Sequence, residues 1–214
     1  MPSDSGAKPF RGVEIMMKKR IRAGILSAFA AAAVFLAGCA DPVVFSEVFQ
    51  LKKGEKIYTK YNLWYTDPEA ISCLNIQQGT FLPIGTEIEP LETTSFFGQK
   101  IVFRDVGNNR RYVIDFDEGY RLCPMQEFIG YTFTTKNREE LLADVPENVR
   151  TRILRGEVVP GMTQAQTILA YGPPPAVRTA DLRNESWFYW ISPEKTIRLV
   201  WRGDKVRNIL NINE

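Results

Sequence analysis

A short apolar run near the start of the chain constrains the fold most, because it separates a leader from the residues that can build a core. Residues 23–36 carry no charge and follow four basic side chains, Lys18, Lys19, Arg20 and Arg22. A basic segment, an apolar stretch and a small-residue exit are typical of a secretory signal. The 14 residues of the run fall short of the roughly 20 that a membrane-spanning helix needs. We therefore expect residues 1–38 to be a leader and signal peptide outside the folded protein.

The signal ends in Leu-Ala-Gly-Cys at 36–39, which resembles the lipobox of bacterial lipoproteins. In that family the cysteine thiol receives a diacylglycerol and becomes the acylated N-terminus after cleavage. The resemblance therefore implies lipid attachment at Cys39, and several acyl chains at one site attach a protein stably to a membrane. An ordinary signal peptide with an incidental cysteine, or an anchored helix, is the alternative.

The residues that flank the signal add two expectations. In enterobacterial lipoproteins an aspartate directly after the cysteine favours the inner membrane, but here Ala40 takes that place and Asp41 follows it. The resemblance thus implies the periplasmic face of the outer membrane, with the inner membrane as the alternative. Residues 1–15 contain acidic and proline residues that do not suit a signal, so we expect translation to begin at Met16 or Met17.

Removing the leader changes the net charge of the chain and the number of cysteines that can form a disulfide. Residues 1–38 carry six basic and two acidic side chains, so the other 176 residues have a net charge of −2, and the full chain one of +2. Such values do not favour a nucleic-acid partner. With Cys39 acylated, Cys73 and Cys123 remain as an even pair in an oxidising compartment, which favours a disulfide between them. Two buried free thiols are the alternative.

The chain contains no histidine, which removes the commonest general base and the commonest metal ligand. We therefore predict a protein that is not an enzyme, with no metal and no cofactor besides the lipid on Cys39. The densest carboxylate group is Asp115, Asp117 and Glu118. A solvated strand face explains it better than a calcium site or an acid–base pair, and a carboxylate-dependent hydrolase is the weakest alternative.

Four segments are expected, and the predicted fold class is α+β. Residues 39–50 follow the signal as a short tether. Residues 51–134 are rich in β-branched and aromatic residues and contain short alternating runs, which predicts a small barrel or meander, loosely similar to SH3-like barrels. One of its strands is expected over 57–65, and Gly-Asn-Asn at 107–109 signals a hairpin. The last segment is 135–214.

Residues 135–214 predict short helices followed by three antiparallel strands, a two-layer unit. Thr163 with Gln166 forms a capping box, and Ala165, Ile168 and Leu169 share one face of the helix that follows. Gly172 ends this helix, because the prolines that follow it forbid continuation. The strands are expected over 185–192, 195–202 and 205–212.

This last segment resembles the SmpA/OmlA (BamE) lipoprotein family. The family's pattern runs from glycine-hydrophobic-threonine through a short helix and L-x-x-G-x-P to W-x-Y at the start of a meander. The structural motif residues that carry it here are Gly161, Thr163, Gly172, Pro173, Trp187 and Tyr189. The resemblance covers roughly residues 147–212 and implies fold more than role, because these residues are structural.

Members of that family support the machinery that inserts β-barrel proteins into the outer membrane. The resemblance implies an accessory or assembly factor that acts by contact with envelope proteins. The alternative is a peptidoglycan- or ligand-binding lipoprotein that uses residues 51–134. An aromatic and four basic residues of the final strands form a candidate interaction surface: Trp190, Arg198, Arg202, Lys205 and Arg207.

Overall fold

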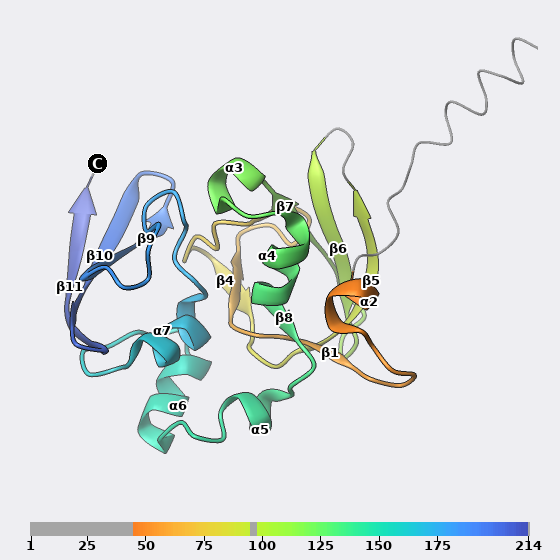
Figure 1. Ribbon diagram of the computed structural model, residues 1–214, viewed down its shortest axis with the longest axis horizontal. Helices are drawn as coiled ribbons and strands as arrows, with labels where there is room; N and C mark the ends of the chain where they lie inside the picture. Colours follow the sequence, from red (N-terminus) through yellow and green to blue (C-terminus); the bar gives the residue numbers. More distant parts are fainter. Residues whose placement is uncertain (1–44, 95–97, 214) are drawn as a thin grey trace, which may run out of the picture. The chain divides into compact units, whose positions relative to one another are not determined.

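The computed structural model describes residues 45–94 and 98–213, so the signal, Cys39 and the first part of the tether lie outside the described residues. The described chain is mixed α and β, with a curled six-stranded sheet, a three-stranded antiparallel sheet, a two-stranded sheet and six helices (Figure 1). Contacts group these residues into one compact unit. Within them, every helix is too short or too polar to span a bilayer.

The six-stranded sheet occupies the part of the chain that was predicted to be β-rich. Its order is β3-β7-β6-β5-β1-β8, and only the β3–β7 pair is parallel. The strands are β1 (Ile57–Thr59), β3 (Ile71–Ser72), β5 (Glu87–Thr94), β6 (Gln99–Asp105), β7 (Arg111–Phe116) and β8 (Phe133–Thr134). The hairpin predicted around 107–109 is confirmed, because β6 and β7 pair antiparallel on either side of it.

A single strand over 57–65 is wrong. The chain forms β1, leaves the sheet, and then forms β2 (Leu63–Tyr65), which pairs with β4 (Thr80–Leu82) in a separate two-stranded sheet. Asn62 stands at the break and is fully buried. Its side-chain amide bonds main-chain groups of three distant segments, including the Ile84 N–H. These bonds replace strand pairing at this point.

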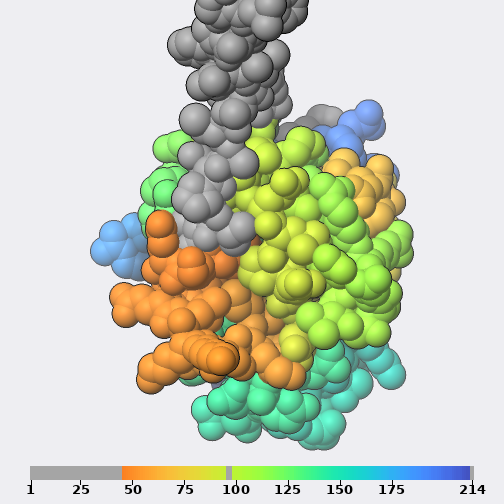
Figure 2. All heavy atoms as spheres, turned by 90° about the vertical axis from the view of Figure 1, so that its right-hand side faces the viewer, coloured from red at the N-terminus to blue at the C-terminus, as the bar shows by residue number. Residues whose placement is uncertain are grey.

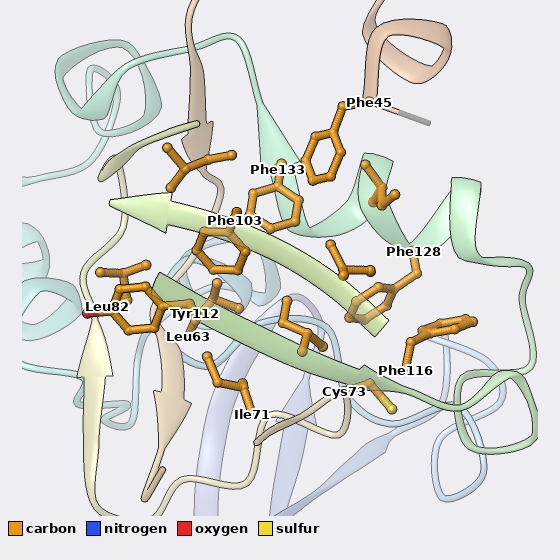
Figure 3. Packing of buried hydrophobic residues seen from close by; sticks show 14 of the residues in the cluster. Phe45, Leu63, Ile71, Cys73, Leu82, Phe103, Tyr112, Phe116, Phe128 and Phe133 are labelled. Atoms are coloured by element: carbon orange, nitrogen blue, oxygen red, sulfur yellow. The ribbon is translucent and has the colours of Figure 1, made fainter. Parts of the chain in front are cut away.

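Three helices within and before the β-rich part were not predicted: α2 (Phe45–Phe49), α3 (Glu118–Arg121) and α4 (Met125–Thr132). The tether expected over 39–50 is therefore structured from Phe45 onward. The Phe45 ring is buried and lies 5.1 Å from the Phe133 ring. Phe128 of α4 packs on Phe116 of β7, with ring centroids 5.1 Å apart (Figure 3).

The C-terminal segment follows its predicted order. It consists of α5 (Arg138–Leu141), α6 (Glu147–Leu154), α7 (Gln164–Tyr171), β9 (Ser186–Ser192), β10 (Lys195–Arg202) and β11 (Lys205–Asn213). The strands form an antiparallel sheet in the order β11-β10-β9. Trp187 and Trp201 are buried on its inner face, and their rings are 4.5 Å apart.

Two hydrophobic clusters fill the molecule, one under the six-stranded sheet and one under the three-stranded sheet. Ile84, from the loop before β5, belongs to the second cluster, and its carbonyl accepts from Arg138 Nε at 2.9 Å. Figure 2 shows residues 45–60 beside the β5–β6 hairpin, with the α5–α6 region below them. The boundary expected between residues 134 and 135 stays a prediction, and many contacts cross it.

Candidate functional site

The predicted interaction surface lies on the outer face of the three-stranded sheet. Strand alternation sends the side chains of Arg198 and Arg202 away from the buried face, and both are exposed. Lys205 stands opposite Arg202 across the β10–β11 turn, and Arg207 is also exposed. Among the described residues, none of these four cations forms an ion pair with a carboxylate. The outer face is therefore a basic patch whose four cations form no ion pair with any carboxylate in the part of the chain that the structure describes.

Aromatic rings extend this basic face onto β9. Phe188 pairs with Arg198 across the strands, and the Arg198 guanidinium lies 5.8 Å from the Phe188 ring. Arg178 lies 5.6 Å from both the Phe188 and the Trp190 rings. Trp190 is half-buried, so only part of its ring is accessible. Arginine stacked on aromatic faces is a common arrangement at binding surfaces.

The structural motif residues cap a helix, turn the chain and pack in the core. Thr163 caps α7 in a complete capping box, as predicted. Gly161 has a φ of +94° and Gly172 one of +77°, so both turn the chain in a way that favours glycine. The Tyr189 hydroxyl is buried and donates to the Gly172 carbonyl at 3.0 Å. These residues shape the fold and expose no reactive group.

Two of the three carboxylates at the end of β7, Asp115 and Asp117, have structural partners. Asp115 accepts from Lys100 Nζ at 2.9 Å, on the exposed face of the β6–β7 pair. Asp117 caps α3 and accepts from the N–H groups of Gly119 and Tyr120. The described residues contain no group of three His, Cys, Asp or Glu side chains placed to hold a metal ion.

Cys73 and Cys123 are free thiols in the structure; Cys73 is buried and Cys123 is half-buried. Both contribute to the same hydrophobic cluster. Burial raises the pKa of each thiol above its ordinary value, and the positive charge of Arg121 acts in the opposite direction. The disulfide is absent from the structure and stays a prediction for the oxidised protein.

An apolar pocket of about 570 Å³ opens between α4 and α7. One wall comes from the α3–α4 turn and α4, a second from α7, and a third from residues 173–182. Pockets of 300–1,000 Å³ with mostly apolar walls and a few polar groups are typical of small-molecule sites. Leu122 and Leu182 add apolar surface at the rim, where they are 61% and 44% exposed. We refer to it below as the α4–α7 pocket.

Sequence reasoning missed this pocket, although it identified one of its walls. The predicted shared face of Ala165, Ile168 and Leu169 exists, but all three side chains line the pocket. The fully buried residues of α7 are instead Thr167 and Ala170. The face of α7 that looks like a core stripe is therefore partly open to solvent. The opposite wall comes from helix α4, which was not predicted, so the sequence carried no signal for the pocket.

No family model, no curated protein and no solved structure matches the chain. The two surface features therefore have to be interpreted from their own chemistry. The outer sheet face presents cations and aromatic rings, and the α4–α7 pocket presents aliphatic walls. Both are arrangements suited to non-covalent binding.

Proposed function

We propose that the protein is a non-enzymatic lipoprotein of the outer membrane that acts by protein–protein contact, as an accessory or assembly factor of the cell envelope. The observation that carries the proposal is the outer face of the three-stranded sheet, where exposed cations adjoin stacked aromatic rings. Interface cores are enriched in arginine and aromatic residues, and unpaired surface charge steers an oppositely charged partner.

The BamE-like arrangement belongs to this proposal. It is supported by the order of two helices and a three-stranded meander, and by the capping and turn geometry of Thr163, Gly161 and Gly172. The resemblance points to the outer-membrane assembly machinery as the partner. The six-stranded sheet has no counterpart in the small members of that family, so it would add a surface that they lack.

Crosslinking in intact cells, with the signal and Cys39 retained, tests the proposal. The expected products are outer-membrane assembly proteins joined to the full chain. Reversing two charges of the patch, Arg202→Glu with Lys205→Glu, should lower their yield at least about tenfold, which corresponds to about 1.4 kcal/mol of binding. The control reverses two exposed charges elsewhere, Lys52→Glu with Lys53→Glu, and should leave the yield unchanged.

The same cells distinguish the alternative function. Recovery of peptidoglycan with no assembly protein, together with pelleting of the full chain by purified cell wall, would replace this proposal with a cell-wall-binding role. Equal loss in the patch and control variants would show that the patch is not the contact surface. Loss of all crosslinked products in Cys39→Ala would instead show that the contact requires the lipid anchor.

A further inference from the structure

Arg121 is a buried cation that lines the α4–α7 pocket. Only 6% of the residue is exposed. Its Nε is buried and has no hydrogen-bond partner, and among the described residues no acidic side chain forms an ion pair with it. Burying a charge is unfavourable unless it is paired and hydrogen-bonded, so an unpaired arginine in this position requires an explanation.

The local chain holds Arg121 in this place. Asp117 caps the short helix α3, which ends at Arg121, and Leu122 then adopts a left-handed conformation with a φ of +52°. This reversal leaves Leu122 exposed and directs Arg121 inward, where its guanidinium lies 5.3 Å from the Phe128 ring. Stacking on a ring compensates for part of the lost hydration but supplies no hydrogen-bond acceptor.

Arg121 also lines the α4–α7 pocket, which otherwise has mainly aliphatic walls. Lys60 is the second cation of the lining, and Glu127 the one carboxylate. Glu127 lies at the exposed rim and accepts from the Tyr131 hydroxyl. The lining therefore has one more positive than negative side chain, and Arg121 is its buried cation.

We propose that the α4–α7 pocket binds a single-chain organic acid, whose apolar chain fills the aliphatic walls and whose carboxylate pairs with Arg121. A planar guanidinium matches a carboxylate with two parallel hydrogen bonds, and such bonds are about twice as strong as neutral ones. The pocket lining shares no residue with the basic outer face of the sheet, so the inference does not depend on the proposed protein contact.

The direct test compares decanoate with its methyl ester on the wild-type protein. The full chain is held in lipid nanodiscs, and equilibrium dialysis measures binding of each radiolabelled ligand after subtraction of empty nanodiscs. Decanoate should bind at least about tenfold more tightly than the ester, because only the acid can pair with the guanidinium. Equal affinities, or no saturable binding of decanoate, would overturn the proposal without any variant.

Variants locate the site. Arg121→Met keeps an unbranched, apolar side chain but removes the guanidinium, so it should lower decanoate affinity at least about tenfold while leaving the ester unaffected. Arg110→Met is the matched control, because Arg110 also stacks on aromatic rings but lies outside the pocket. Ala165→Phe adds a ring to an exposed position of the α7 wall and should weaken both ligands. Undiminished binding in Arg121→Met or in Ala165→Phe would contradict the assignment.

Two competing occupants give different results in the same assay. If acetate displaces decanoate at equal concentration, the apolar walls contribute nothing and Arg121 is only a small-anion site. If sedimentation shows a dimer that Ala165→Phe dissociates and decanoate leaves intact, a second copy of the chain fills the pocket. Either result would overturn the proposal.

Discussion

Asn62 joins three distant segments through buried side-chain hydrogen bonds. Its Nδ2 donates to the carbonyls of Ile153 at 2.7 Å and Ala170 at 3.2 Å, and its Oδ1 accepts from the Ile84 N–H at 2.9 Å. Ala170 lies in the last turn of α7, where its usual donor would be the N–H four residues later. That residue is Pro174, which has no N–H. We therefore predict that Asn62→Ala destabilises the protein strongly.

The size of the loss follows from the groups left without partners. Ile153 keeps the bond from the Gly156 N–H, so its carbonyl remains satisfied. The Ile84 N–H and the Ala170 carbonyl lose their side-chain partner, at about 1–3 kcal/mol each for a buried unsatisfied group. The free energy of unfolding should fall by about 4 kcal/mol, and Tm by roughly 10 °C for a chain of this size.

Urea denaturation of the full chain in detergent micelles, followed by tryptophan fluorescence, measures this loss. Asn108→Ala is the matched control, because Asn108 is exposed and its side chain accepts only from the nearby Arg110 N–H. The control should change the free energy of unfolding by less than about 1 kcal/mol. A loss below about 1 kcal/mol in Asn62→Ala as well would refute the claim that Asn62 joins the segments.

Three further predictions use the same unfolding measurement or mass spectrometry. Gly172→Ala should lower the free energy of unfolding by about 1–3 kcal/mol more than Gly161→Ala does. Both variants place alanine at a positive φ, but only at Gly172 would the added Cβ lie 2.7 Å from the buried Tyr61 ring. Thr163→Ala should remove about 1 kcal/mol by deleting the α7 cap. Protein isolated from cells without reductant should gain the mass of two hydrogen atoms on reduction, because a Cys73–Cys123 disulfide is expected; an unchanged mass would establish free thiols.

The C-terminal strands and α7 could be predicted because local and tertiary preferences agree there. Trp187 and Leu199 alternate with solvent-facing residues along strands that are covered on one face only. The alternation of apolar and polar residues in the sequence therefore identifies the buried face of each strand. Thr163 and Gly172 set the ends of α7 by capping and turn chemistry that depend only on neighbouring residues. Such signals remain readable without knowledge of the fold.

The β-rich part was harder because its structure depends on distant contacts. Helix α4 begins after Pro124 with no side-chain cap, and contains Gly130, which lowers its helix propensity. The run around Asn62 has strand composition, but the side-chain bonds of Asn62 to remote segments break it. The α4–α7 pocket could not be predicted for the same reason, since its walls come from elements that are far apart in the sequence.

Buried polar contacts between distant segments also connect the α4 and α7 walls of the pocket. The Tyr61 hydroxyl pairs with Thr132 Oγ1 of α4 at 3.0 Å, and the Tyr61 ring lies against Gly172 at the end of α7. Asn75 adds a bond to the Tyr171 carbonyl at 2.7 Å. The walls are thus fixed before any ligand arrives, and a preformed site loses little conformational entropy on binding. The proposed organic acid would therefore reach the Arg121 guanidinium with little rearrangement of the pocket walls.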